Sequence, residues 1–213
     1  MIDSLVTFVI NLSGGSAALG IVLFTLAVRL LLLPLDVRRD RAMKVRERLA
    51  PKLRELQKRH ARNPERLSGE MSALFAKEGT SPFAGFLPML AQLPFMWLMY
   101  RVATHPTALV GHDLFGAPLG QQVAGVVANY GLVSMPVLVF VMVIALVAAV
   151  AWLSARNIKV AEDQPQWLRR LLPWLPYGSV LAALVLPLAG ALYLLVSTAW
   201  AAGERAVLAS RPL

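Results

Sequence analysis

Long stretches of this chain carry no charged residue, and that pattern constrains the fold more than any other feature. Residues 79–100, 114–155 and 171–203 contain no Asp, Glu, Lys or Arg, and residues 17–35 contain only Arg29. A helix needs roughly 20 mostly apolar residues to cross the hydrocarbon core of a bilayer. The hydrophobic content is 57%, above the roughly 45–50% of soluble domains. The sequence therefore predicts an all-α, polytopic membrane protein.

Five membrane-spanning helices account for these tracts. The tract at 171–203 is long for one span, and Pro187 in its middle is a natural break because proline interrupts helical hydrogen bonding. We predict two short spans there, with one long tilted or kinked helix as the alternative. The predicted layout of this single membrane domain, residues 1–213, is an extracytoplasmic interfacial segment (1–16), span 1 (17–35), a cytosolic segment (36–80), span 2 (81–103), an extracytoplasmic loop (104–131), span 3 (132–154), a cytosolic loop (155–170), span 4 (171–186), span 5 (187–203) and a cytosolic tail (204–213).

The basic residues are distributed unevenly and predict the orientation. Of the 21 Lys and Arg residues, 19 lie in 36–81, in 155–170 or after Gly203, whereas 1–16 and 105–130 contain none. With five spans, these two groups fall on opposite faces of the membrane. Because basic loops stay on the cytoplasmic side, we predict an extracytoplasmic N-terminus and a cytosolic C-terminus. Tryptophans near the predicted inner ends of the spans are expected to act as interfacial anchors: Trp152, Trp167, Trp174 and Trp200.

The segment at 36–80 is predicted to form a basic helical hairpin. It contains 13 basic and 7 acidic residues. Asn63-Pro64 signals a turn, and Pro51 is expected to bend or restart the first helix. The charge alone fits a solvated hairpin that fixes topology, a surface for anionic headgroups, or one for ribosomal RNA. Apolar residues recur at spacings of three and four, on one face of each predicted helix: Leu49, Leu53 and Leu56, then Leu67, Met71, Leu74 and Phe75.

The residues that usually carry catalysis are absent or badly placed. The chain has no cysteine, which excludes disulfides and thiolate chemistry. His60, His105 and His112 lack metal-ligand spacing, and none lies in a predicted span. Residues 15–20 lack the Lys and Ser or Thr of a phosphate-binding loop. We therefore expect no enzyme activity, no metal and no cofactor.

Arg29 is a permanent positive charge inside the first predicted span. It lies six residues before Leu35, about 9 Å from the inner end of the helix. The side chain either snorkels to the headgroups or faces a polar cavity. Thr25 lies one turn earlier on the same helix face, which favours the cavity. Further polar side chains occur in two other predicted spans, and together they predict a shared hydrophilic interior: Gln92, Tyr193, Ser197 and Thr198.

A set of motifs runs through the chain in a definite order: Arg29 with Pro34-Leu35, a basic hairpin containing Pro51, Glu78-Gly79 ahead of Pro82, then Gly85, Leu87-Pro88, Gln92 and Pro94. This order and spacing resemble the YidC/Oxa/Alb family of membrane protein insertases, in the bacterial short form without a large extracytoplasmic domain. The last span is similar through Pro187, Tyr193 and Ser197, and departs from the family pattern at three positions: Ala189, Leu194 and Thr198.

The resemblance implies five core spans around a hydrophilic groove that opens to the cytosol and the lipid and is closed toward the outside. It implies a groove lined by Arg29, Thr25, Gln92, Tyr193 and Ser197. The expected function is insertion and folding of nascent membrane proteins in the bacterial plasma membrane, without nucleotide hydrolysis. Expected partners are those substrates and membrane lipids, with the ribosome and the Sec translocon as further candidates, and no DNA. The alternatives are a small channel or transporter with an Arg-lined cavity, and a non-inserting assembly scaffold.

Overall fold

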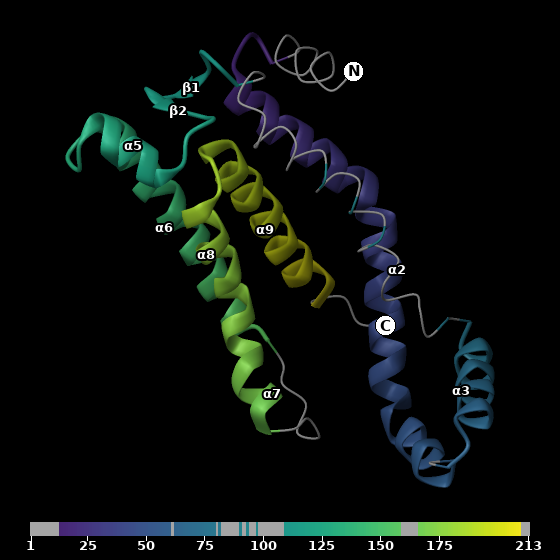
Figure 1. Ribbon diagram of the computed structural model, residues 1–213. Helices are drawn as coiled ribbons and strands as arrows, with labels where there is room; N and C mark the ends of the chain where they lie inside the picture. Colours follow the sequence, from purple (N-terminus) through teal and green to yellow (C-terminus); the bar gives the residue numbers. More distant parts are fainter. Residues whose placement is uncertain are drawn as a thin grey trace. The chain divides into compact units, whose positions relative to one another are not determined.

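The computed structural model is predominantly helical (Figure 1). It describes residues 13–60, 62–79, 81, 90, 93, 97, 109–158 and 166–209. The chain forms two compact units, one made of Met1–Arg29 with Phe95–Leu213 and the other of Leu30–Pro94. Most of the predicted interfacial segment (1–16) and of the predicted second span (81–103) lies outside the described residues.

Helix α2, Ala17–Arg59, is one uninterrupted helix of 43 residues. Its start is capped by Ser16, whose hydroxyl oxygen accepts from the backbone N–H of Leu19 at 3.4 Å. The sequence predicted a span that ends at residue 35 and a separate cytosolic helix bent or restarted at Pro51. The structure instead continues the helix through Pro34 and Pro51. Leu, Arg, Ala and Lys dominate the flanking residues and no glycine occurs between positions 20 and 69, so helix propensity outweighs the two prolines.

Helix α3, Pro64–Lys77, follows a sharp turn at the position predicted from Asn63-Pro64. The Asn63 side chain accepts from the backbone N–H of Arg66 at 3.1 Å. Pro64 occupies the first turn, where its missing N–H costs nothing, and Glu65 adds a favourable charge there. These local signals explain why the turn was visible in the sequence.

The second unit has a small apolar core between the C-terminal part of α2 and α3. Leu49, Leu53 and Phe75 are buried in it, with Val45, Met71 and Leu74 packed around them. The two helices are also joined by an ion pair between Arg48 and Glu78 at 3.3 Å. Five of the seven apolar residues predicted from their spacing therefore lie where the two helices meet, whereas Leu56 and Leu67 are not part of this core.

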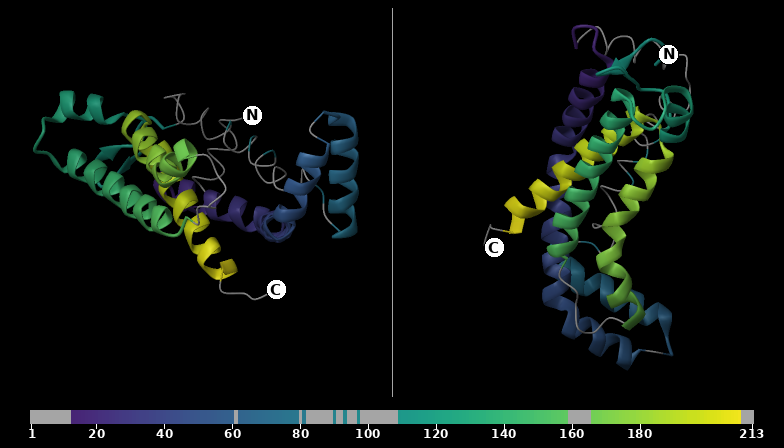
Figure 2. Two further views of the ribbon diagram at one scale, coloured as in Figure 1. Left: turned by 90° about the horizontal axis from the view of Figure 1, so that it is seen from below. Right: turned by 90° about the vertical axis from the view of Figure 1, so that its left-hand side faces the viewer.

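The first unit is built around helix α6, Met135–Arg156, which packs against α8, Gly178–Val185, and α9, Leu188–Ala209 (Figure 1 and Figure 2). Helix α7, Gln166–Leu171, and the 3₁₀ helix η2, Leu172–Tyr177, precede α8. The face of α6 that meets these helices is buried at spacings of three and four residues: Val139, Phe140, Val143 and Val147.

The uncharged tract at 171–203 is split at Pro187, as predicted. Helix α8 ends at Val185, Leu186 is extended, and α9 begins at Leu188. The alternative of one long helix is wrong. Two details also differ from the prediction: Pro173 and Pro176 tighten residues 172–177 into a 3₁₀ helix, and α9 continues past residue 203 to Ala209.

The loop before α6 is folded rather than irregular. Strands β1, Asp113–Leu114, and β2, Ala117–Pro118, pair antiparallel and lead to helix α5, Val123–Tyr130. Phe115 and Gly116 form the tip of this hairpin, and both have positive φ (51° and 82°), as a type I′ two-residue turn requires.

The same loop completes the first turn of α9. The backbone N–H of Leu188 donates to the carbonyl of Gln121 at 3.0 Å, and that of Ala189 donates to the carbonyl of Leu119 at 3.0 Å. The first N–H groups of a helix have no partner within the helix. Here a distant part of the chain supplies the acceptors, so loop and helix are held as one body.

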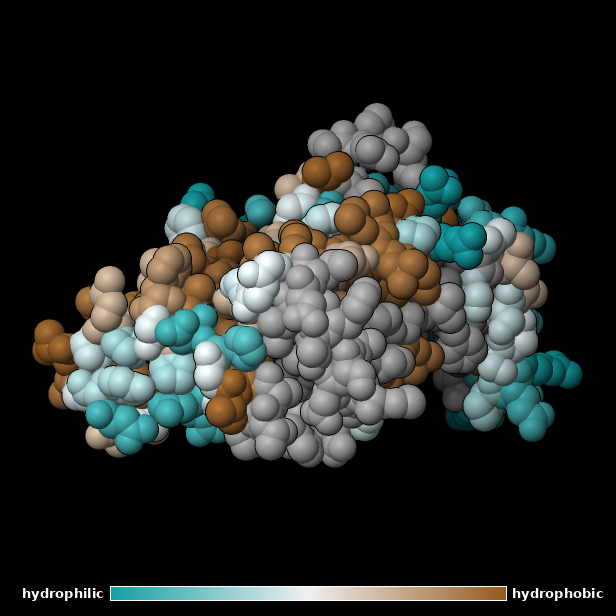
Figure 3. Space-filling view, turned by 90° about the horizontal axis from the view of Figure 1, so that it is seen from above, coloured by the Kyte–Doolittle hydropathy of each residue, from teal (hydrophilic) through white to brown (hydrophobic). Residues whose placement is uncertain are grey.

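Two of the described helices, α2 and α6, are long and apolar enough to cross a membrane. A core helix of a soluble protein would hide most of its apolar side chains, whereas α6 exposes a second apolar face that includes Leu138, Val141 and Leu146. Many side chains on the visible face in Figure 3 are hydrophobic. This exposure is expected of helices that contact lipid.

Candidate functional site

Arg29 on α2 contacts Ser197 on α9. The Nη2 group of Arg29 donates a hydrogen bond to the hydroxyl oxygen of Ser197, although the two residues are 168 positions apart. Ser197 is buried and Arg29 is half-buried. The structure thus brings together two of the five site residues predicted from the sequence, both within the first unit.

The position of Arg29 follows from the buried face of α2. Ala18, Ile21 and Thr25 are buried and follow one another at spacings of three and four. Arg29 comes four residues after Thr25 and continues the same stripe. The predicted first-span residues therefore lie on the face that packs inward, not on the exposed one.

Thr25 lies in that stripe, and its hydroxyl proton is used within its own helix. Its hydroxyl donates to the backbone carbonyl of Ile21 at 2.6 Å, within its own helix. This bond satisfies the buried hydroxyl proton, since Thr in a helix commonly bonds to the carbonyl one turn earlier. The oxygen of Thr25 remains an acceptor beside the first-unit core.

On α9 the predicted polar residues behave differently from one another. Tyr193 is half-buried and packs against the apolar core of the first unit. Ser197 follows one turn later and receives Arg29. Thr198 donates to the carbonyl of Leu194 at 2.6 Å, so its hydroxyl is satisfied inside the helix. Gln92, the fifth predicted site residue, lies outside the described residues.

Trp200 lies on the face of α9 that carries Ser197, and the sequence did not predict it as part of the site. It comes three residues after Ser197, on the face shared with Tyr193. Its indole N–H is buried and has no hydrogen-bond partner among the described residues. From the sequence, Trp200 was predicted to be an interfacial anchor. Its spacing of three residues from Ser197 is the signal that could have placed it on the polar face of α9.

The charge of Arg29 is not neutralised by an acidic side chain in the described part of the chain. Its hydrogen bond is to a neutral hydroxyl. Four ion pairs between described residues lie elsewhere, in the basic segment of the second unit. A half-buried guanidinium without a carboxylate partner keeps a positive potential available for an anionic group.

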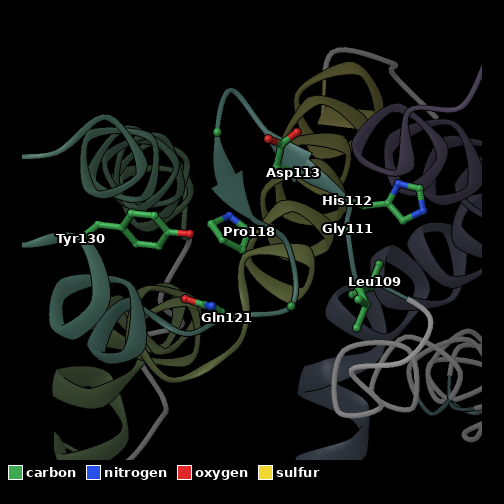
Figure 4. A pocket seen from close by; sticks show the side chains of 10 residues that line it. Leu109, Gly111, His112, Asp113, Pro118, Gln121 and Tyr130 are labelled. Carbon is green, nitrogen blue, oxygen red and sulfur yellow. The ribbon is translucent and has the colours of Figure 1, made fainter.

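A cavity of about 410 Å³ lies in the loop around β1 and β2 and is lined by residues that include His112, Asp113, Gln121 and Tyr130 (Figure 4). The His112 side chain points away from Tyr130 and Gln121. The four described residues of the predicted site, which are Arg29, Thr25, Tyr193 and Ser197, do not line this cavity. Within the described residues, no three His, Asp or Glu side chains gather where a metal ion could bind.

Nearly the whole chain matches one known protein family. The family described as 60Kd inner membrane protein matches residues 8–212. The chain belongs to the 60Kd inner membrane protein family. This membership and the two long apolar helices α2 and α6 agree that it is a membrane protein.

Several curated relatives in the 60Kd inner membrane protein family carry insertase names. The chain is 37% identical over 98 residues to the membrane protein insertase YidC of Clostridium perfringens, covering 46% of this chain and 41% of that protein. It is 31% identical over 125 residues to the membrane protein insertase MisCA of Bacillus subtilis, covering 57% and 48%. It is 27% identical over 218 residues to the membrane protein insertase YidC of Streptomyces avermitilis, covering 91% and 51%.

These relatives confirm the family resemblance predicted from the motifs of the sequence. The chain spans about half the length of the curated relatives that it matches.

Proposed function

We propose that the protein is a membrane protein insertase and chaperone, which inserts nascent membrane proteins and helps them fold. The observation that carries this proposal is Arg29, a half-buried positive charge on an apolar helix, bonded to the buried hydroxyl of Ser197 and to no acidic side chain among the described residues. Family membership and the insertase names of the relatives support the same function.

In this proposal Arg29, Thr25, Gln92, Tyr193 and Ser197 line a hydrophilic groove among five spans. The groove opens to the cytosol and the lipid and is closed toward the outside. Moving a polar tail through hydrocarbon is costly because its polar groups lose their water. A wet groove that reaches partway into the bilayer shortens the apolar distance that the tail must cross.

The charge of Arg29 attracts acidic residues in the translocated tail of the substrate. Arginine suits this role better than lysine because it stays protonated when it is partly desolvated. The apolar helix of the substrate then leaves the groove sideways into the lipid, and burial of its apolar surface supplies the driving force. This cycle uses no nucleotide and no covalent chemistry.

The basic segment of the second unit is the proposed receiving surface on the cytosolic side. This assignment follows the orientation predicted from the Lys and Arg residues, with the N-terminus outside and the C-terminus in the cytosol. The expected partners are nascent membrane proteins and membrane lipids, and the ribosome and the Sec translocon are further candidates for the exposed basic face.

Reconstitution of the full-length protein tests the proposed function. The protein is placed in phosphatidylcholine vesicles with two single-span substrates, one with an acidic and one with a neutral translocated tail. An insertase raises the protease-protected fraction of both, and raises the acidic-tailed one more. Release of a small trapped dye without substrate protection would instead support the channel or transporter alternative. Absence of both protection and dye release would support the non-inserting scaffold.

A further inference from the structure

Asp36 is a buried acidic residue whose carboxylate is incompletely satisfied. The side chain sits in α2 and the residue is only 9% exposed. Its Oδ2 atom is inaccessible to solvent and has no hydrogen-bond partner among the described residues. An unpartnered carboxylate oxygen in a buried position is rare, because each such group loses its water without gaining a donor.

Other acidic residues of the second unit are satisfied within the chain. Asp40 pairs with Lys44 at 3.2 Å, and Glu55 pairs with Arg59 at 3.0 Å. Asp36 is surrounded in sequence by basic residues, since Arg38, Arg39 and Arg41 follow it, but those three arginines are exposed to solvent. These three neighbouring arginines thus stay in water, and none of the described residues donates to the buried oxygen of Asp36.

We propose that Asp36 binds the Lys or Arg residues that flank a substrate's span on the side retained in the cytosol. This inference rests on the proposed insertase function and adds a determinant of substrate orientation to it. Asp36 is the first charged residue of the segment that carries 13 basic and 7 acidic side chains. Retained flanks of membrane proteins are rich in Lys and Arg, so that segment would repel them. Asp36 supplies one buried acceptor in this repulsive field.

The chemistry of the position selects a cationic side chain as the occupant. A metal ion would need more ligands, and no cluster of three His, Asp or Glu side chains lies in the described parts of either unit. A Lys or Arg head group on a long apolar stem pairs with this carboxylate once the incoming substrate displaces the groups that cover it, and the stem stays in contact with apolar surface. Arg29 lies seven positions earlier in the sequence and carries the opposite charge. It is proposed to attract acidic residues of the translocated tail, whereas Asp36 attracts basic residues of the retained flank.

The test uses three substrates that share one acidic tail and one apolar span, and differ only in the retained flank, which carries two Lys, two Gln or two Glu. Full-length protein is reconstituted in phosphatidylcholine, whose headgroup has no N–H donor to compete for Asp36. We expect the wild type to insert the Lys-flanked substrate about fivefold more efficiently than the Gln-flanked one. Asp36→Asn should bring that ratio near one and leave the Gln-flanked substrate unchanged. Asp36→Lys should favour the Glu flank.

Asp40→Asn is the matched control, because it removes an equal charge one turn away that is already paired with Lys44. It should keep the ratio of the wild type. If Asp36→Asn also keeps the ratio, or lowers the insertion of the Lys-flanked and Gln-flanked substrates equally, the inference is wrong. If the wild type inserts the Gln-flanked substrate but shows no preference for Lys, the inference fails while the proposed function stands. If the wild type inserts neither substrate, the proposed function fails and the inference falls with it.

A crosslinking measurement separates contact from efficiency. The chain contains no cysteine, so Leu33→Cys places a single thiol one turn before Asp36. A substrate with one cysteine in its Lys-flanked retained end should form a disulfide with it under mild oxidation, and one with the cysteine in the translocated tail should not. Adding Asp36→Asn should lower the yield about fivefold. An equal yield with and without the Asp36 charge would overturn the proposal.

Discussion

Arg29 differs from a structural arginine in the kind of partner that it has. A structural arginine in an apolar setting is usually held by a carboxylate, and the pair then has little charge left to offer. Arg29 is held by the hydroxyl of Ser197, which orients the guanidinium and leaves its charge intact. This arrangement orients the group for an incoming anion without neutralising it beforehand.

Replacement of Arg29 should therefore change the response to substrate charge. We expect Arg29→Ala to lower insertion of an acidic-tailed substrate about tenfold, or about 1.4 kcal/mol, and that of a neutral-tailed substrate much less. Arg29→Lys should retain most activity, because the charge is kept and the guanidinium geometry is lost. The readout is the protease-protected fraction in vesicles. Equal losses for both tails would indicate that Arg29 serves folding and not substrate charge.

Ser197 is predicted to act by positioning Arg29. Ser197→Ala removes one hydrogen bond of about 1 kcal/mol, so insertion of the acidic-tailed substrate should fall roughly fivefold. Thr198→Ala is the control, because the Thr198 hydroxyl bonds to its own helix. A Ser197→Ala variant that also carries Arg29→Ala should insert the acidic-tailed substrate as efficiently as Arg29→Ala alone. Additive losses in that double variant would contradict a positioning role.

Asp36 also predicts a change in stability. Because its buried Oδ2 lacks a donor among the described residues, Asp36→Asn should raise the free energy of unfolding in detergent, without substrate, by about 1–2 kcal/mol. Thermal unfolding of the purified protein measures this difference. A lower midpoint temperature for Asp36→Asn than for the wild type would mean that the carboxylate is stabilised in the resting protein.

The hairpin-like pairing of α2 with α3 depends on few of the described residues. Among them, three side chains are buried in the core, and the side chain of Asn63 caps the turn. Such a small unit is expected to open locally more often than the first unit, whose buried cluster is several times larger. The second unit is therefore the part in which single substitutions should show most clearly.

We expect Asn63→Ala to destabilise α3 by about 1 kcal/mol, since it removes the cap on the Arg66 N–H, and Phe75→Ala by about 3 kcal/mol. Hydrogen exchange of the α3 amides would increase accordingly. Ser68→Ala serves as the control, because Ser68 is exposed and bonds only to the nearby carbonyl of Glu65. Protection in the first unit should stay unchanged. Unaltered exchange in α3 after Phe75→Ala would show that the core is not what holds it.

The elements that the sequence predicted well are those with local signals. Asn63-Pro64 and Pro187 each mark a break through their own backbone chemistry, and both breaks are present. The continuity of α2 was missed because a proline inside a helix and a proline at its boundary look alike in sequence. The choice between them depends on the propensity of some twenty residues on either side, which no single motif displays.

The predicted orientation in the membrane rests on the distribution of charge alone and calls for a direct measurement. The absence of cysteine makes single-cysteine variants simple to build. Val110→Cys, on an exposed loop position, should react with a membrane-impermeant thiol reagent in intact cells, and Ser68→Cys on α3 should react only after permeabilisation. Labelling of both, or the reverse order, would contradict an extracytoplasmic N-terminus with a cytosolic basic segment.

The site was predictable only in part, for a physical reason. Arg29, Thr25 and Ser197 stood out because polar groups in apolar tracts are expensive and so are conspicuous. Which of them meet could not be read from spacing, because Arg29 and Ser197 are joined by packing across 168 positions. Asp36 was hidden for the opposite reason. It begins a charged segment, where one more acidic residue looks ordinary until its burial is known.

The cap on α9 has a consequence for how the chain assembles during synthesis. The carbonyl of Gln121 accepts from Leu188 and that of Leu119 accepts from Ala189, and both carbonyls leave the ribosome well before α9 does. Helix α9 thus forms against acceptors that have already been synthesised. Its register matters, because a shift by one residue that brought Pro187 into the place of Leu188 would leave the carbonyl of Gln121 without an N–H donor. The loop therefore constrains the register in which α9 packs during synthesis.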